Sequence, residues 1–351
     1  MRVARLGSQA EAISKVADLA RAGACTLYVR NAVDDAVAAV RALRARGITA
    51  RLLHARFTLH DRKHHEREVM SIFGKDGGRR IKRNGTAEVL VATQVVESSL
   101  DLDFDAVVSD LAPMASLIQR SGRLWRHMDL RPREGRPVRE PVLYLVSPQP
   151  DADVTHNWLD AIMPKGRWVY PLHDQWRTAR VLLERGSIQA PEGLRDLIEA
   201  VHGREAQPLP ETLVAVEERR QAQGDIEDGR AGHRVISVDE GYRAAGGGAD
   251  GEQYPTRLGR PTITLNLLRH YEPRIVTWAR RKSPAYSEVS APLHRILDLE
   301  DLPEIPVEVL DQHREHWTRW KRIGTRVMHV PQGGRICTGL TYSRKFGLLF
   351  E

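Results

Sequence analysis

Short apolar runs alternate with amphipathic segments along the first 150 residues. The run 25–31 predicts a strand, and apolar residues at every third or fourth position over 33–43 predict a helix that Asn31 caps. The remaining elements predicted here are a strand over 48–57, a helix over 59–73, and strands over 87–93, 106–112 and 142–148. Because strands that alternate with helices form parallel sheets through right-handed crossovers, we expect an α/β fold with helices on both faces of the sheet.

The pattern changes after the last of these strands, and it divides the chain into three parts. Residues 1–150 are expected to form the sheet domain, and residues 151–222 a helical connector. Residues 223–351 are expected to form a small strand-containing accessory domain. This last part holds a flexible glycine-rich loop over 244–253 and a closing hairpin around 343–345.

The composition is that of a soluble globular chain with a basic surplus. The 351 residues are 41% hydrophobic and 28% charged, and no apolar run approaches the length that spans a bilayer. Cys25 and Cys337 are too few for a disulfide framework, and the first 20 residues lack a secretory signal, so we expect a cytoplasmic protein without membrane association. The net charge of +7, carried mostly by arginine, suits a polyanion partner.

The stretch SLIQRSGRLWRH, residues 116–127, combines three arginines with large apolar residues. If 116–128 forms one helix, one arc is apolar and the opposite arc is basic. The basic arc carries Gln119, Arg120, Arg123, Arg126 and His127. A solvated charged face is one explanation of this pattern. Gly122 argues for a ligand instead, because a glycine within a helix costs about 1 kcal/mol relative to alanine and is best explained by a close approach to the backbone.

An acidic and hydroxyl-rich loop precedes this stretch. The buried strand 87–93 ends at Thr93, and the following residues include Glu97, Asp101 and Asp103. Ligands of parallel sheets bind at the carboxyl ends of the strands, where hydroxyls suit phosphate and carboxylates suit ribose or a metal ion. An ordinary acidic loop is the alternative interpretation.

The two segments together, in this order, resemble motifs V and VI of superfamily 2 helicases. ATQVVESSLDLD (92–103) and LIQRSGRLWRH (117–127) match closely, and TLYVRN (26–31) takes the place of motif IV. The CRISPR-associated helicase-nuclease of type I interference systems is similar in these motifs and in HARF (54–57), and more weakly in RLGRPTITLNLL and GLTYSRKFGLLFE. The resemblance implies the C-terminal half of such a protein: a second RecA-like lobe, a connector and an accessory domain.

The resemblance also implies roles for individual residues at a nucleotide site. Arg123 and Arg126 would be catalytic arginine fingers that reach the γ-phosphate of ATP. Asp101 would contact the ribose or the second arginine, and Gln119, Arg120 and Gly122 would belong to the same cofactor site. Arginines aimed at developing phosphoryl charge stabilise the transition state electrostatically.

The same resemblance implies partners. Thr93, Arg30, Asn31 and Arg56 would contact the backbone of single-stranded DNA. The chain would work beside an RNA-guided surveillance complex, and ATP with Mg²⁺ would be held mainly by a separately encoded half that carries the P-loop and the nuclease. We therefore expect ATP-dependent helicase or translocase function only with that half present.

Several features of the family are not found in this sequence. No G-x-x-x-x-G-K-[ST] motif, the P-loop that binds phosphates, occurs. The segment 233–242 is similar to an acidic metal-holding motif, but it lies downstream of the arginine motif, which is the wrong side for this family. The pairs His60-Asp61 and His173-Asp174 lack the further ligands of a two-metal nuclease, and the histidines of 54–65 lack zinc-like partners, so we expect no metal site.

Two other functions stay open from the sequence. The chain could be a lobe of another superfamily 2 helicase that acts on RNA or damaged DNA. It could also be a non-catalytic DNA-binding or docking protein, or the remnant of a broken gene. The accessory domain would distinguish the first of these, because RNA-directed relatives usually carry other modules.

Overall fold

The computed structural model describes residues 1–75, 85–97, 100–151, 153–219, 261–271 and 274–350. The chain forms two compact units, one of Met1–Ala55 and Arg62–Glu217, the other of Arg56–Asp61 and Glu218–Glu351. The glycine-rich loop 244–253 and the acidic segment 233–242 lie outside the described residues. The division at residues 150 and 222 stays a prediction.

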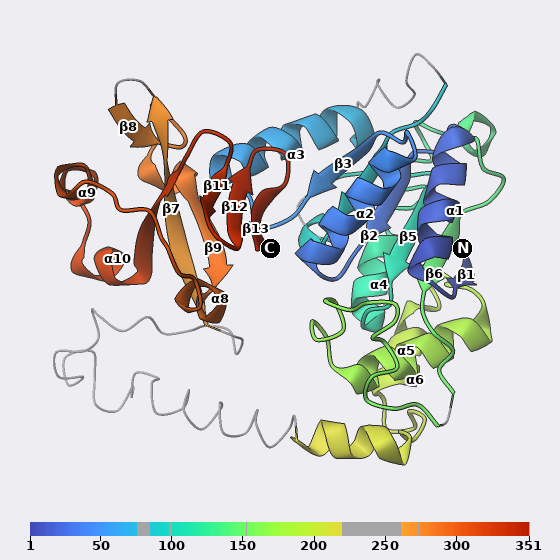
Figure 1. Ribbon diagram of the computed structural model, residues 1–351. Helices are drawn as coiled ribbons and strands as arrows, with labels where there is room; N and C mark the ends of the chain where they lie inside the picture. The colour runs from blue at the N-terminus through green and yellow to red at the C-terminus, as the bar shows by residue number, and fades with distance from the viewer. Residues whose placement is uncertain (76–84, 98–99, 152, 220–260, 272–273, 351) are drawn as a thin grey trace, which may run out of the picture. The chain divides into compact units, whose positions relative to one another are not determined.

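The first unit is built on a six-stranded parallel sheet with the strand order β1-β6-β5-β2-β4-β3 (Figure 1). Its strands are β1 (Arg2–Leu6), β2 (Thr26–Val29), β3 (Ala50–Leu53), β4 (Val89–Ala92), β5 (Ala106–Asp110) and β6 (Val142–Val146). All residues of β2, β4 and β5 are buried, so both faces of the sheet are covered, as parallel sheets require. The α/β class predicted from the sequence is confirmed.

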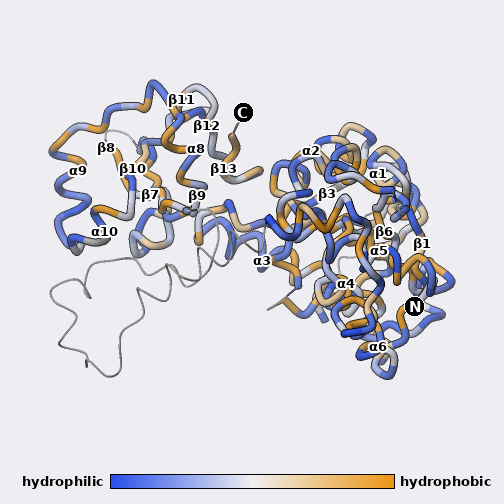
Figure 2. The backbone as a smooth tube through the Cα atoms, turned by 90° about the horizontal axis from the view of Figure 1, so that it is seen from below, coloured by the Kyte–Doolittle hydropathy of each residue, from blue (hydrophilic) through white to orange (hydrophobic). Residues whose placement is uncertain are grey.

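Helices cover this sheet in two groups. The helices of the unit include α1 (Gln9–Arg21), α2 (Val33–Ala45), α4 (Met114–Ser121), α5 (Leu172–Arg185) and α6 (Leu194–His202), and α3 (Leu59–Phe73) belongs to it from Arg62 onward. Two short 3-10 turns, η1 (Gln94–Val96) and η2 (Arg133–Gly135), follow β4 and precede β6. Helices α1 and α2 contact each other and the strands, whereas α4 contacts α5 and α6. The mostly hydrophilic α3 has the bounds that the sequence predicted (Figure 2).

Two local predictions need correction. The strand β1 and helix α1 were not predicted, although β1 pairs along its whole length with β6. Asn31 does not cap α2: the cap position is Ala32, which makes no capping hydrogen bond through its side chain. The side chain of Asn31 instead donates to the carbonyl of Leu111 at 2.7 Å, because the strand-end position draws it toward the sheet.

The second unit contains two smaller sheets. Parallel β10 (Thr325–Val330) and antiparallel β8 (Arg274–Thr277) and β9 (Glu288–Pro292) pair with β7 (Thr262–Tyr271). The other sheet joins β11 (Arg335–Cys337), β12 (Leu340–Ser343) and β13 (Gly347–Phe350), with the hairpin predicted around 343–345 between β12 and β13. The remaining elements of this unit are η3 (Pro284–Ser287), α8 (Leu293–Leu297), α9 (Val307–Arg314) and α10 (Arg319–Gly324).

The segment Arg56–Asp61 belongs to the second unit because its groups are bonded there. The hydroxyl of Tyr342 donates to Asp61 at 2.8 Å, and the amide of Thr58 donates to that hydroxyl at 3.0 Å. The amide of Leu348 donates to the carbonyl of Arg56 at 2.8 Å. Within the described residues, no helix combines the length and the apolar character needed to cross a membrane.

Candidate functional site

The carboxyl ends of β2, β4 and β5 lie side by side at one edge of the first unit's sheet. Asn31, Thr93 and Asp110 occupy or follow these ends, as the predicted strands implied. The amide of Thr93 donates to the carbonyl of Leu53, and the side chain of Gln94 donates to the carbonyl of Asn31. Backbone bonds therefore fix this edge, and both Asn31 and Thr93 are 3% exposed.

Arg120 joins this edge to the neighbouring segments. It is fully buried, and a guanidinium has five N–H donors. Its hydrogen bonds run to Glu97 Oε1, Ser109 Oγ, the Asp110 carbonyl, Asn31 Oδ1 and the Tyr170 hydroxyl, at 2.8–3.2 Å. In this structure Arg120 therefore positions other groups rather than reaching solvent. Its role in cofactor binding stays a prediction.

Arg30 is also enclosed, with 1% of its surface exposed. Its Nε donates to Asp110 Oδ2 at 2.8 Å, and its Nη2 lies 3.8 Å from Asp35 Oδ2. Burial disfavours the charge, yet the nearby Asp110 carboxylate raises the pKa of Arg30 above its ordinary value. Arg30 thus holds the start of α2 against β5 in this structure, and its contact with DNA stays a prediction.

Helix α4 is shorter than the helix predicted over 116–128. It ends at Ser121, and Gly122 is its C-terminal cap, exposed and with an ordinary φ of −64°. The argument from a glycine within a helix was therefore wrong. The predicted basic arc also fails, because Arg120 and Arg123 are buried at 0% and 7% exposure while Gln119 stays exposed.

Trp125 turns the chain between the two proposed arginine fingers. Its φ is +52°, a left-handed conformation that is strained by about 1–2 kcal/mol for a residue with a side chain. The strain is held by two hydrogen bonds, from its amide to the Phe104 carbonyl and from its Nε1 to the Asp105 carbonyl. Arg123 and Arg126 therefore lie on either side of a braced turn in one short loop.

Arg123 is held by carbonyl groups. Its Nε donates to the carbonyl of Val96 at 2.9 Å, and its Nη2 donates to the carbonyl of Glu97 at 3.0 Å. In the part of the chain that the structure describes, no carboxylate accepts a hydrogen bond from it. Burial, and next the charge of Arg126, lower the pKa of Arg123, so this guanidinium lies where an added anion would stabilise its charge.

Arg126 faces solvent beside Asp101. Its Nε donates to Asp101 Oδ1 at 2.5 Å, and His127 Nε2 lies 3.2 Å from the same oxygen. Partial desolvation opposes ionisation of Asp101, but the hydrogen bond from Arg126 and the charges of His127, Arg126 and Arg123 lower the pKa of this carboxyl. With 41% and 45% of their side chains exposed, Arg126 and Asp101 are accessible to a ligand.

A buried ionic cluster packs against the loop that carries Arg123 and Arg126, which we call the arginine loop. Asp103 and Asp105 are fully buried, and each pairs with Arg131 and Arg136. Arg136 Nη2 donates to both oxygens of Asp103, at 3.1 and 3.2 Å. Since Asp103 Oδ1 also accepts a hydrogen bond from the amide of Arg126 at 2.9 Å, the cluster fixes the backbone of Arg126.

Three further residues support the site, and the sequence did not predict their roles: Arg136, Tyr170 and Asp35. The only sequence signal for Arg136 was the local excess of arginine after the motif, which does not reveal its aspartate partners. Arg56, predicted to contact DNA, belongs to the second unit, where its guanidinium lies 5.6 Å from the ring of Phe350.

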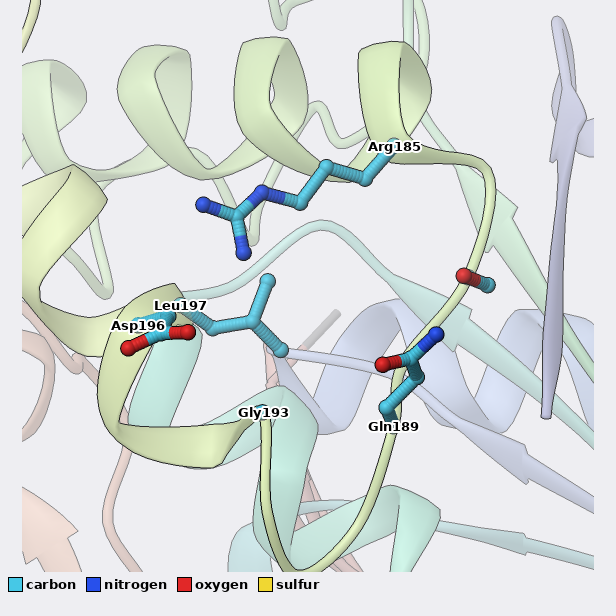
Figure 3. A pocket seen from close by; sticks show the side chains of 6 residues that line it. Arg185, Gln189, Gly193, Asp196 and Leu197 are labelled. Carbon is cyan, nitrogen blue, oxygen red and sulfur yellow. The ribbon is translucent and has the colours of Figure 1, made fainter.

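No group of three or more His, Cys, Asp or Glu side chains within the described ranges is arranged to hold a metal ion. His173 instead forms ion pairs with Asp174 and Glu217. A shallow cavity of about 250 Å³ is lined by Arg185, Ser187, Gln189, Gly193, Asp196 and Leu197 (Figure 3). It contains none of the residues predicted for the site.

Comparisons with known proteins place this geometry in a family. Residues 22–129 match the family described as CRISPR-associated nuclease/helicase Cas3, C-terminal. The CRISPR-associated endonuclease/helicase Cas3 of Thermus thermophilus is 32% identical over 313 residues, which are 81% of this chain and 32% of that protein. The chain thus spans about a third of the length of this relative.

Solved structures agree on the fold. The crystal structure of T. fusca Cas3 with ADP superposes with a TM-score of 0.75 at 22% identity, covering 99% of this chain and 42% of that one. A chain of a CRISPR RNA-guided surveillance complex, pre-nicking, gives a TM-score of 0.70 at 22% identity, covering 100% of this chain and 44% of that one. These likenesses confirm the predicted RecA-like fold class. The family match and the Thermus relative show that the chain is similar to the C-terminal region of the CRISPR-associated Cas3 helicases.

Proposed function

We propose that this chain is the second RecA-like lobe and accessory domain of an ATP-driven DNA translocase in CRISPR defence. The observation that carries the proposal is the arginine loop at the carboxyl edge of the sheet. Arg123 lacks a carboxylate hydrogen-bond acceptor among the described residues, and Arg126 is exposed beside it. Two such guanidinium groups on a short, braced loop suit the phosphates of a nucleotide.

Arg123 and Arg126 suit contact with one side of the phosphate groups of ATP. When bound, ATP with Mg²⁺ supplies the phosphoryl group that is transferred to water. Arg123 offers a charge already oriented by two carbonyls, so little reorganisation is needed when phosphate charge develops. Arg126 is held by Asp101 until an anion competes for it, which keeps the second guanidinium near the site.

The remaining parts of the nucleotide site would come from outside these 351 residues. A P-loop lobe, on the same polypeptide or on another, would hold most of the nucleotide and its Mg²⁺, and the nuclease would likewise lie elsewhere. An arginine finger contributes to hydrolysis only against a phosphate that another element positions.

Single-stranded DNA is the proposed substrate track, and an RNA-guided surveillance complex the proposed partner. The similarity to a chain from such a complex supports the partner. Thr93, Asn31, Arg30 and Arg56 are proposed DNA contacts. For the buried ones, the backbone groups at the strand ends or a rearrangement of their hydrogen bonds would have to make the contact.

The test is an Arg123→Ala variant assembled with a P-loop lobe. We expect DNA-stimulated ATP hydrolysis to fall by about a thousandfold or more, as for loss of an arginine finger, while DNA binding stays nearly unchanged. Arg133→Ala is the matched control, because Arg133 is an exposed arginine on η2. Unchanged hydrolysis with lost DNA binding would show that Arg123 is a DNA contact instead.

A further inference from the structure

The β7–β8 hairpin of the second unit presents arginines and an aromatic ring on one face. Arg269 pairs with Val276 and Tyr271 pairs with Arg274, and residues two apart on a strand point to the same side. Arg269, Tyr271 and Arg274 therefore share a face. Tyr271 is 48% exposed, and the guanidinium of Arg280 lies 4.1 Å from the centroid of its ring.

Trp278 extends this face and lies near two arginines, Arg269 and the additional Arg344. The guanidinium of Arg269 lies 5.8 Å from the indole centroid and that of Arg344 lies 5.6 Å from it. The indole is itself fixed, since its Nε1 donates to Asp61 at 2.7 Å and its ring meets Tyr342 edge-on at 4.9 Å. The cations are therefore grouped around a rigid aromatic base.

We call this group the cationic surface; it consists of Arg269, Tyr271, Arg274, Trp278, Arg280 and Arg344. Its positive charge is poorly compensated. Arg344 Nε lies 3.7 Å from Asp61, whose other oxygen already accepts from Trp278 and Tyr342. Arg269, Arg274 and Arg280 form no ion pair in the described part of the chain. Burial, and then the charge of Arg344, lower the pKa of Arg269, in line with mutual repulsion.

We propose that the cationic surface binds the phosphodiester backbone of a single-stranded nucleic acid, with a base stacked on Tyr271. Guanidinium groups suit phosphate, and an exposed ring between them suits a base, which is the combination used by sequence-independent single-strand binders. The proposal adds a second nucleic-acid contact, on the accessory unit. It depends on the proposed function only in the choice of DNA as ligand.

The experiment measures binding of a fluorescently labelled oligothymidylate to the 351-residue chain by anisotropy, over a series of salt concentrations. The Arg280→Gln/Arg344→Gln variant is compared with Arg319→Gln/Arg335→Gln, which removes two exposed arginines from other elements of the same unit. Loss of two phosphate contacts lowers the slope of log affinity against log salt by about 0.7 for each contact. The control pair is expected to change the slope little.

Substitutions of Tyr271 distinguish the contribution of base stacking to binding from that of the positive charges. We expect Tyr271→Ala to weaken binding by roughly tenfold with no change in the salt slope, and Tyr271→Phe to restore binding. Equal affinity and slope for the two arginine pairs, or no binding by the unaltered chain, would overturn the proposal. Stronger competition by polyglutamate than by unlabelled oligothymidylate would assign the surface to an acidic protein instead.

A failure here is distinct from a failure of the proposed function. Arg123→Ala is expected to leave this binding unchanged, so the binding test stands whether or not the test of ATP hydrolysis succeeds. Thermal unfolding of each variant shows whether the fold is retained, and the exposure of Arg280 and Arg344 makes retention the expected result.

Discussion

At the scale of single residues, the arginines of this chain act in two ways that depend on burial. Arg136 is fully buried between Asp103 and Asp105, whereas the Arg126–Asp101 pair is 41% and 45% exposed. Removing one partner of a buried pair leaves an uncompensated charge, while an exposed pair is screened by water.

This difference predicts losses of stability of very different size. Arg136→Met is expected to lower the free energy of unfolding by about 3–5 kcal/mol, because two buried carboxylates lose one of the two arginines with which they form ion pairs. Arg126→Met, the matched control, is expected to cost about 0–1 kcal/mol. Urea unfolding measures both, and equal costs would refute the assigned role of the cluster.

The Asp101 carboxyl provides a test by pH. Its pKa lies below the ordinary value in the folded chain, despite some desolvation, because Arg126 donates to it and His127 and Arg123 add positive charge. Its interactions therefore stabilise the fold above the unfolded pKa of about 3.9 and are lost as the pH falls through the lower folded pKa. We expect Arg126→Gln to raise the pKa of Asp101, measured by NMR titration. Arg133→Gln is expected to leave it unchanged, and an unshifted pKa in both variants would contradict the pairing.

The sequence predicted which side chains form the candidate site, but it did not predict which of them are buried. It selected Arg123, Arg126 and Asp101, which the structure gathers in one loop region. It did not predict that all five donors of Arg120 are satisfied internally, because those partners come from four segments far apart in the sequence. Long-range partners carry no local pattern.

At the scale of elements, the connector is fastened to the edge of the sheet by a glycine. The amide of Gly166 donates to Asp35 Oδ2 at 2.9 Å, and a Cβ built on Gly166 would lie 3.1 Å from the Cβ of Asn31. The nearby Tyr170 hydroxyl completes the bonding of Arg120. The connector therefore braces the carboxyl edge.

Gly166→Ala tests this bracing. The added methyl group would push the connector from Asn31, so we expect a loss of about 1–3 kcal/mol in unfolding free energy. Gly135→Ala is the control, because a Cβ there meets nothing within 4 Å, and it is expected to change stability by less than about 0.5 kcal/mol. If thermal or urea unfolding gives the two variants the same stability, the connector does not brace this edge.

Helices and strands with a clear repeat of apolar residues could be predicted from the sequence. The ends of elements that tertiary contacts determine could not be predicted. The predicted helix 59–73 matches α3, and the strand cores of β2 to β6 lie within the predicted runs. The end of α4 at Ser121 was missed because the left-handed Trp125 and the bridge between Phe104 and Leu124 interrupt an otherwise helical pattern. Contacts of this kind join segments that are distant in the sequence, so a local sequence pattern does not reveal them.

At the scale of the whole molecule, we propose that the chain supplies one wall of a nucleotide site, because its 351 residues hold an arginine motif but no recognisable P-loop. The central claim is that the arginine loop acts only on a phosphate positioned by another lobe. The matched share of 32% of the Thermus relative leaves ample sequence for such a lobe in a protein of that kind.

The most direct test measures ATP hydrolysis by this chain with single-stranded DNA, alone and after addition of a P-loop lobe. The account predicts no turnover by the chain alone, and DNA-stimulated turnover with the lobe that disappears in the Arg123→Ala variant. Measurable turnover by the chain alone, or unchanged turnover when the Arg123→Ala variant is combined with the lobe, would contradict it.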